Sequence, residues 1–170
     1  MGCGCLQSSQ SNNKIYGKWT KDYCDCDKNS KDKFFYDDDI VKEIYWRSTN
    51  LVNDHVRRLA NVGRVLIFGL GEIMFKGTSL THDYVEVLMQ CHICKKEKWV
   101  TFEYGFKGKQ CCVGYYSRNH SLHACISNCE NRTMGSIREK FDDLKGFGEG
   151  TYHFIKHNCK TFAKTFFQLL

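Results

Sequence analysis

Two segments whose residues alternate between polar and apolar, 81–89 and 99–104, constrain the fold most strongly. Side chains at every second position of a β-strand share one face, so this alternation predicts two strands. Only the short turn 91–96 lies between them, and so short a connection predicts antiparallel pairing. The sequence therefore predicts a β-hairpin near the middle of the chain.

The predicted hairpin brings a histidine and a carboxylate together. Counting alternate positions puts His82 and Tyr84 on one face of the first strand. Antiparallel pairing about the turn then places Glu103 of the second strand opposite this region, on the same face. A carboxylate beside a histidine can orient it as a base. We therefore expect His82 and Glu103 to form a base-and-orienter pair.

Residues 38–60 predict an amphipathic helix of about five turns before the hairpin, because apolar residues recur there at intervals of three and four. The acidic run 37–39 at its start and two arginines near its end complement the helix dipole. Gly63 would stop this helix, and residues 64–68 then predict a strand.

A second helix is predicted over 136–144, after a stretch of loops and short strands in 105–135. Ser136 and Glu139 have the spacing of a capping box at its start. Three glycines between 146 and 150 are expected to end it.

The last predicted helix runs from Cys159 to Leu170, after a short strand at 152–155, and Asn158 is its expected N-cap. Cys159 shares one face of this helix with Phe162 and Phe166, so it is expected to point inward.

The chain is long enough for one compact domain, with 170 residues of which 42% are hydrophobic and 26% charged. Residues 7–38 are mostly Ser, Asn, Lys and Asp, so we divide the chain into a polar tether, 1–37, and a folded domain, 38–170. Within the tether, Cys24 and Cys26 are too close for a standard zinc pair, and we expect them to be incidental or an additional acylation site. We predict neither a membrane-spanning segment nor a secretory signal peptide.

The first residues predict a lipid anchor. Removal of Met1 would expose the Gly2 amine for N-myristoylation, and Cys3 and Cys5 are placed to supply palmitoylation as the second signal that stable anchoring needs. The run resembles the doubly acylated anchor of Src-family kinases of the Lck type, although Leu6 stands where Ser or Thr is usual. We therefore expect a cytoplasmic, peripherally membrane-bound protein whose cysteines are reduced.

The net charge of +6 is spread along the chain and suits an acidic partner or an anionic membrane equally. Basic and aromatic residues are not interleaved as in nucleic-acid-binding modules, so we expect no nucleic-acid partner.

Cys91 and Cys94 in the hairpin turn have the spacing of a zinc half-site, but a tetrahedral site needs two more ligands. The one other pair with suitable spacing among the later cysteines is Cys125 and Cys129. We expect reduced thiols and no required cofactor, with a structural zinc at Cys91 and Cys94 as the alternative.

Cys159 is the best candidate nucleophile, because the positive end of a helix dipole lowers the pKa of a thiol. Unpaired N–H groups at the same helix start can hold an oxyanion. A buried structural cysteine is the alternative. Among the other histidines, His120 and His123 are the alternatives to His82 as the base.

Three segments resemble the PPPDE thiol peptidases, the desumoylating isopeptidases of a circularly permuted papain-like superfamily. The segment Tyr152 to Phe162 is similar to the family's tyrosine, short strand and Asn-Cys-x-x-Phe. His82-Asp83-Tyr84-Val85-Glu86-Val87 and Glu103-Tyr104-Gly105-Phe106 match its histidine strand and its Glu-aromatic strand in order. The resemblance covers about residues 63–170.

The resemblance implies an α+β, circularly permuted papain-like (NlpC-like) domain with a small antiparallel sheet. It implies Cys159 as nucleophile, His82 as general base, Glu103 as its orienter and Asn158 as a residue that positions the helix. The expected activity is hydrolysis of isopeptide or peptide bonds after ubiquitin-like modifiers. Hydrolysis or transfer of acyl groups on lipids or thioesters, and a catalytically inactive membrane adaptor, are the alternatives.

Overall fold

The computed structural model describes residues 18–20, 24, 26, 35–50, 81–117, 120–153 and 156–170. Nine elements are defined in them: β1 (Lys18–Thr20), β2 (Ile40–Asn50), β3 (Thr81–Gln90), β4 (Glu97–Gly105), β5 (Gly108–Val113), β6 (Tyr115–Ser117), β7 (His120–Ile126), α3 (Met134–Asp143) and α4 (Cys159–Leu169). None of the described helices is long and apolar enough to cross a membrane.

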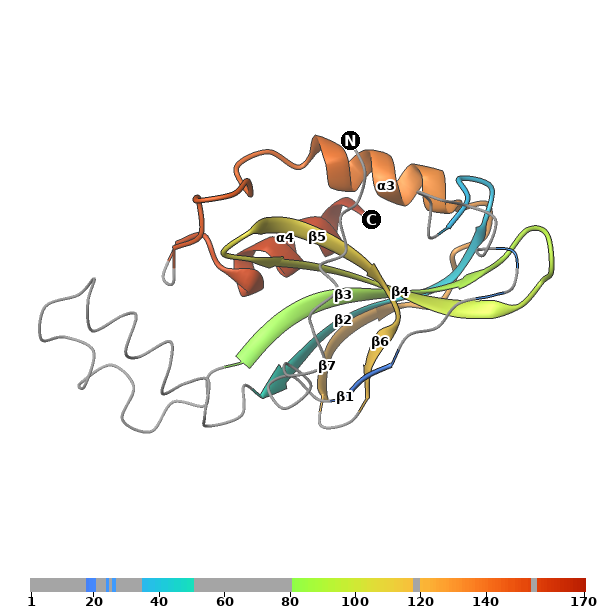
Figure 1. Cartoon of the computed structure of the whole chain (residues 1–170), viewed down its shortest axis with the longest axis horizontal. Helices are drawn as coiled ribbons and strands as arrows, with labels where there is room; N and C mark the ends of the chain where they lie inside the picture. The colour runs from blue at the N-terminus through green and yellow to red at the C-terminus, as the bar shows by residue number, and fades with distance from the viewer. Residues whose placement is uncertain are drawn as a thin grey trace, which may run out of the picture.

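A five-stranded antiparallel sheet forms the centre of the fold, in the order β5-β4-β3-β2-β7. β1 and β6 pair separately as a two-stranded sheet. Figure 1 shows α3 and α4 together on one side of the central sheet. The fold is therefore a small α+β arrangement of an antiparallel sheet and two helices.

The core lies between the sheet and these helices. Alternate residues of β3 and β4, including Val85, Val87 and Phe102, are fully buried there. The Phe102 ring lies 5.0 Å from that of Phe141 in α3 and 5.3 Å from that of Phe166 in α4, measured between centroids. Because strand residues alternate between faces, the intervening residues His82 and Glu103 lie on the face away from these helices.

The predicted hairpin is confirmed, with its register. β3 pairs with β4 from Tyr84 opposite Glu103 to Gln90 opposite Glu97. The short turn leaves little freedom in how the strands align, so the alternation alone was enough to place Glu103 near His82.

The predicted helix over 38–60 is wrong for the described residues, because 40–50 form β2. A β-bulge between Val41 and Glu43 shifts the register, so Val41 opposite Met89 and Ile44 opposite Val87 face the core together. The bulge therefore places buried residues three positions apart, which is also the spacing of a helix face. The remainder of the predicted helix, and the strand predicted at 64–68, lie outside the described residues.

The prediction of a polar tether also fails for the residues before 38 that the structure describes. Residues 18–20 pair with β6, Cys24 is 3% exposed, and Phe35 is part of the hydrophobic core. These residues belong to the folded unit, because pairing partners and apolar contacts distant in the sequence hold them.

The helix near residue 136 begins slightly earlier than predicted. Its N-cap is Thr133, whose hydroxyl accepts the Ser136 backbone N–H, so the expected capping box of Ser136 and Glu139 is not the one that forms. The strand expected at 152–155 is represented by one bridge between His153 and His157, and residues 154–155 lie outside the described part.

Candidate active site

Asn158 fixes the start of α4, as predicted. Its side-chain oxygen accepts the Thr161 backbone N–H at 3.0 Å, and the Thr161 hydroxyl accepts the Asn158 N–H at 2.9 Å. This reciprocal cap makes Cys159 the first residue of the helix and limits how that residue can move.

Cys159 lies where β3 and β4 separate. Their pairing ends at Tyr84 and Glu103, and beyond this point the Cys159 sulfur lies 3.8 Å from the Thr81 carbonyl oxygen. The Asp83 backbone N–H also donates to this sulfur. The thiol therefore approaches the backbone of β3 itself. It does so from α4, which packs on one face of the sheet, whereas the His82 side chain lies on the other face.

His82 connects the cysteine to a carboxylate. Its Nε2 is 2.9 Å from Glu103 Oε2, and the ring also hydrogen-bonds with the Cys159 thiol. Because Nε2 faces Glu103, Nδ1 is the ring nitrogen left for Cys159. The three residues predicted as nucleophile, base and orienter therefore form one continuous chain of contacts.

Tyr116 in β6 completes this chain, and the sequence analysis missed it. Its hydroxyl donates to Glu103 Oε2 at 2.6 Å, the same oxygen that faces His82. Tyr116 is buried, and its ring packs against that of Tyr84 at a centroid distance of 4.8 Å. No local pattern marks this tyrosine, because its contact with Glu103 depends on how the chain turns after β5.

The surroundings of Cys159 and His82 favour a thiolate and an imidazolium. Burial opposes ionisation of Cys159, but the hydrogen bond and charge of His82 and the Asp83 N–H outweigh it and lower the pKa of the thiol. Burial alone would lower the pKa of His82, but its hydrogen bonds to Cys159 and Glu103 raise that pKa well above the usual value. Each group therefore stabilises the charged form of the other.

Glu103 remains a carboxylate in this arrangement. Burial raises its pKa, but the hydrogen bond and charge of His82, together with the Tyr116 hydroxyl, bring the pKa below the ordinary value. A negative charge is thus held on the side of the histidine away from the thiol, where it stabilises the imidazolium.

The start of α4 can also hold negative charge on a bound reactant. The first N–H groups of a helix have no partner within it, and Asn158 takes up that of Thr161, the third residue. The N–H groups of Cys159 and Lys160, the first two residues of the helix, come before it. N–H groups at such a helix start can stabilise an oxyanion.

The alternative histidines lie elsewhere. His120 and His123 are on β7, which β2 separates from β3. The His123 ring faces the Ser48 hydroxyl at 2.9 Å, and His120 is exposed. Among the described histidines, the one with a hydrogen bond to Cys159 is His82.

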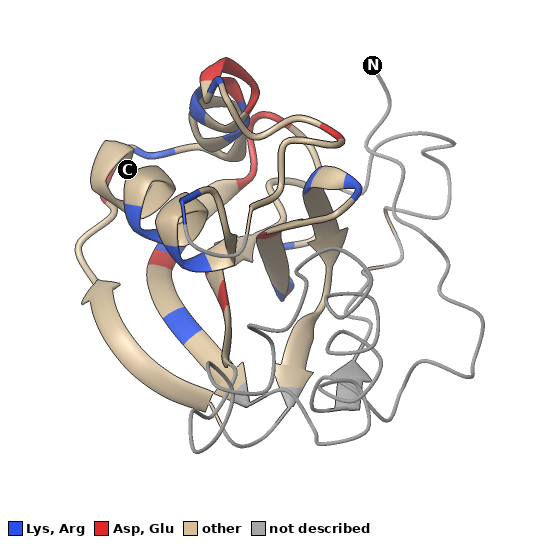
Figure 2. Ribbon diagram, turned by 90° about the vertical axis from the view of Figure 1, so that its left-hand side faces the viewer, with Lys and Arg blue, Asp and Glu red and all other residues tan. Residues whose placement is uncertain are grey.

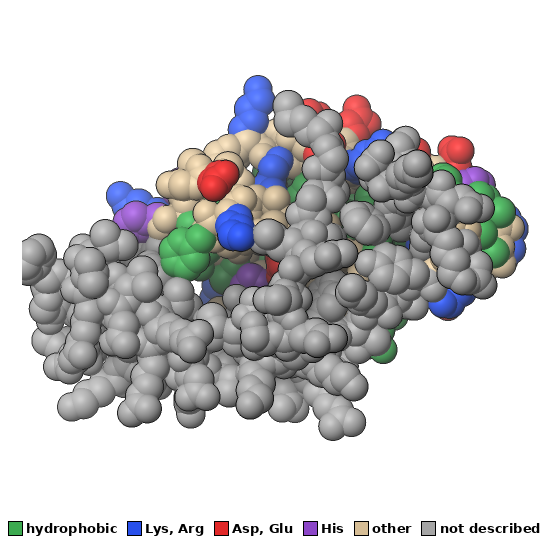
Figure 3. All heavy atoms as spheres, in the orientation of Figure 1, with side chains coloured by type: hydrophobic (Ala, Val, Ile, Leu, Met, Phe, Trp, Pro, Cys, Tyr) green, Lys and Arg blue, Asp and Glu red, His purple; other side chains and the backbone are tan. Residues whose placement is uncertain are grey.

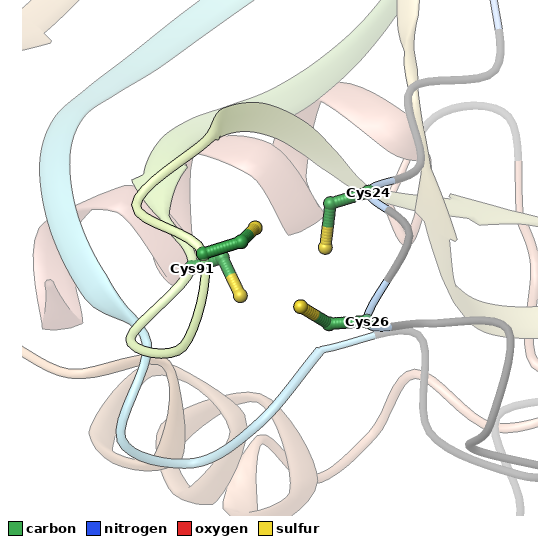
Figure 4. A group of neighbouring side chains, drawn as sticks. Cys24, Cys26 and Cys91 are labelled. Carbon is green, nitrogen blue, oxygen red and sulfur yellow. The ribbon is translucent and has the colours of Figure 1, made fainter.

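A second group of residues, which we call the four-cysteine cluster, comprises Cys24, Cys26, Cys91 and Cys94. Their sulfur atoms all lie within 4.8 Å of one another, an arrangement that could hold a metal ion. Figure 4 shows Cys24 and Cys26, on the N-terminal segment, facing Cys91 across a common centre. Cys24 and Cys26, which we expected to be incidental or an additional acylation site, therefore lie beside the half-site of Cys91 and Cys94. Their spacing along the sequence did not indicate this proximity.

The predicted alternative partners of Cys91 and Cys94 do not join them. Cys125 is exposed on β7 and Cys129 follows that strand, and neither belongs to the cluster. Within the cluster, a backbone N–H donated by Lys96 is the main cause that lowers the pKa of Cys94 to about 7, against the opposing effect of burial.

The candidate active site and the cluster lie at opposite ends of the same hairpin. His82 is the second residue of β3, whereas Cys91 follows its last residue. In Figure 1, the start of β3 lies near the beginning of α4, and the turn between β3 and β4 extends to the other end of the sheet. The two groups are therefore separate sites.

Charge around the fold is mixed. Figure 2 shows α3 with residues of both signs and α4 with basic residues. The basic residues of α4 are Lys160 and Lys164, and both are exposed. On the face in Figure 3, positive and negative side chains are interspersed over the described surface. Surface charge on this face does not select one class of partner.

Comparison of the chain with protein-family models, curated proteins and solved structures finds no significant match. The lipidation residues Gly2, Cys3 and Cys5 lie outside the described part of the chain. The geometry around Cys159 and the four-cysteine cluster is therefore the basis for any functional assignment.

Proposed function

We propose that this protein is a cysteine hydrolase that cleaves isopeptide or peptide bonds, with Cys159 as nucleophile and His82 as general base and acid. The observation that carries the proposal is the position of His82, which contacts the Cys159 thiol on one side and Glu103, at 2.9 Å, on the other. A nucleophile, a base and a group that orients the base are the elements that thiol hydrolysis requires.

The reaction begins with attack of the Cys159 thiolate on the carbonyl carbon of the substrate. The carbonyl oxygen becomes an oxyanion, which the N–H groups of Cys159 and Lys160 stabilise. The His82 imidazolium gives its proton to the leaving amine as the carbon–nitrogen bond breaks, and a thioester remains. Water then attacks the thioester while His82 accepts its proton, and the released sulfur returns to the thiolate.

The substrate class rests on the resemblance to PPPDE peptidases, with ubiquitin-like conjugates as the proposed substrates and a circularly permuted papain-like arrangement as the proposed fold relationship. The order histidine, glutamate, cysteine along the chain supports both, as does the position of the cysteine at the start of the last helix. Acylation at Gly2, Cys3 and Cys5 would place the enzyme on the cytoplasmic side of a membrane, close to membrane-associated conjugates.

A catalytically inactive adaptor is the second candidate, and the low exposure of the site favours it. Cys159 is 6% exposed and His82 is 8% exposed. A substrate carbonyl must reach the Cys159 sulfur in an enzyme, whereas an adaptor does not need that access.

The first test is the pKa of Cys159, measured from its rate of alkylation against pH and read by mass spectrometry of the Cys159 peptide. We expect a pKa below the ordinary thiol value in the wild type. In His82→Ala it should rise above that value, because burial remains after the stabilising partner is lost. His120→Ala, on the exposed edge strand β7, is the matched control and should behave as the wild type.

A wild-type pKa that does not respond to His82→Ala would contradict the proposed dyad. If the dyad is present, a ubiquitin-like protein with an electrophile at its C-terminus distinguishes the two candidates. A covalent adduct on Cys159 that is absent in Cys159→Ser supports the hydrolase, whereas a reactive thiol that never forms the adduct favours the adaptor. A long-chain acyl thioester serves as the parallel probe for acyl-group chemistry.

A further inference from the structure

We propose that the four-cysteine cluster binds one Zn²⁺ through four thiolates, and that the ion fastens the N-terminal segment to the tip of the β3–β4 hairpin. The inference concerns a site at the far end of β3 from His82. It stands or falls independently of the chemistry proposed for Cys159.

The positions of the sulfur atoms fit a tetrahedral ion. All four lie within 4.8 Å of one another. A zinc–sulfur bond of about 2.3 Å places the corners of a tetrahedron roughly 3.8 Å apart, so the sulfurs need to move inward by about 1 Å or less. One half-site is Cys24-x-Cys26 and the other is Cys91-x-x-Cys94, in the turn that follows β3.

A buried lysine supplies the positive charge that such a site needs. Four thiolates around one Zn²⁺ carry a net charge of −2. Lys98 is fully buried, and its ammonium nitrogen lies 3.7 Å from the Cys24 sulfur and 4.0 Å from Asp39 Oδ2. Burying an ammonium group is costly unless negative charge compensates for it. A thiolate-bound zinc would place such charge directly beside Lys98.

Hydrogen bonds around the cluster hold both half-sites in place. The buried carboxylate of Asp39 accepts the His92 backbone N–H and faces His92 Nδ1, each at 2.9 Å, and also accepts the Tyr36 N–H at 3.0 Å. The Tyr36 hydroxyl donates to the Cys26 carbonyl oxygen at 3.1 Å. Asp39 and Tyr36 thus connect the turn of one half-site to the segment of the other, as residues around metal ligands commonly do.

The bound ion would join parts of the chain that are distant in the sequence. Cys24 and Cys26 lie between β1 and β2, and Cys91 and Cys94 lie between β3 and β4. Zinc would therefore hold the segment between β1 and β2 against the tip of the β3–β4 hairpin.

The test is metal analysis of the full-length chain, purified under reducing conditions with Zn²⁺ supplied and unbound metal removed. We expect about one zinc per chain, and near zero in the Cys91→Ser/Cys94→Ser variant. Cys112→Ser/Cys125→Ser is the matched control, because these two thiols lie outside the cluster, and it should retain the zinc.

Cobalt titration of the wild type provides a readout that does not depend on whether a variant folds. Co²⁺ should give the intense visible absorption of a tetrahedral thiolate site, and Zn²⁺ should displace it. Lys98→Met should weaken zinc binding by roughly 10- to 100-fold in competition with a chelator, as expected for a group just outside the ligands.

The proposal is overturned if the reduced wild-type chain binds no zinc or if the cluster variant keeps it. Disulfides among these four cysteines in the reduced preparation would also overturn it. None of these outcomes changes the expected pKa of Cys159, so failure of the zinc site and failure of the proposed hydrolase are distinguishable.

Discussion

At the scale of single residues, the Tyr116 hydroxyl is the contact most open to test. It donates to the Glu103 oxygen that faces His82, and it helps to keep Glu103 ionised. Tyr116→Phe removes this hydrogen bond and leaves the ring, so we expect the Glu103 carboxylate to lose about 1 kcal/mol of stabilisation. The pKa of Glu103, followed by NMR of its side-chain carboxyl group, should then rise by less than about one unit.

Tyr115→Phe is the control for this prediction. The Tyr115 ring lies beside that of Trp99, at a centroid distance of 6.2 Å. If both tyrosine variants leave the pKa of Glu103 at the wild-type value, Tyr116 does not stabilise the Glu103 carboxylate.

The charge state of His82 should depend on Glu103 in a way that NMR can measure. Glu103 raises the pKa of His82, so Glu103→Gln should lower it, whereas Glu97→Gln at the other end of β4 should not. Because catalysis needs a thiolate and an imidazolium together, activity should rise as pH passes the lowered pKa of Cys159. It should fall as pH passes the raised pKa of His82. An unchanged His82 titration in Glu103→Gln would contradict Glu103 as the orienting group.

The contact of His82 with Glu103 could be predicted from the sequence, but that of Tyr116 with Glu103 could not. Two alternating strands and a short turn allow few registers, and each register places particular residues opposite one another. Tyr116 reaches Glu103 only after the chain has passed through β5 and turned at Gly114. That path depends on packing rather than on a local pattern.

At the scale of elements, the cap of α4 connects local sequence to the position of the nucleophile. Asn158→Ala removes the side-chain acceptor for the Thr161 N–H and should cost about 1 kcal/mol, a fall in Tm of roughly 2–4 °C. Asn158→Asp keeps an acceptor and should retain most of the stability. Its negative charge beside the sulfur should nevertheless raise the pKa of Cys159.

Thermal unfolding and alkylation of these variants test the two effects separately. Gln168→Ala, at the exposed end of the same helix, is the control and should change neither quantity. If Asn158→Ala unfolds at the wild-type temperature, the reciprocal cap does not stabilise α4 in solution.

β2 shows why element type was harder to predict than the cap. The Asn158 cap is a local interaction over four residues, and its side chains could be recognised from the sequence alone. In β2, the bulge at Val41 and Glu43 interrupts the alternation, and the buried residues then follow a helical spacing. Only the neighbouring strands β3 and β7 establish that the segment is extended, because β2 pairs with both.

At the scale of the whole molecule, only two of the four cysteines in the four-cysteine cluster could be predicted from the sequence as metal ligands. Cys91 and Cys94 are close in the sequence and carry a recognisable spacing, but their partners Cys24 and Cys26 lie on a distant segment. Which of the cysteines would join them depends on how the N-terminal segment crosses the fold. Periodicity and spacing carry no information about such a crossing.

The two sites should act independently, because the length of β3 separates them. His82 and Cys91 are nine positions apart along an extended strand, or roughly 30 Å. Substitutions at this distance that share no partner usually have additive effects. We therefore expect Cys91→Ser/Cys94→Ser to lower the stability of the fold while changing the alkylation pKa of Cys159 by less than about 0.3 unit.

Combining the cluster substitutions with His82→Ala completes the test. The pKa increase caused by His82→Ala should be the same with and without an intact cluster. A clear difference would mean that the cluster at the tip of the hairpin affects the pKa of Cys159 at the other end of the hairpin. The cluster would then regulate Cys159 as well as hold the N-terminal segment.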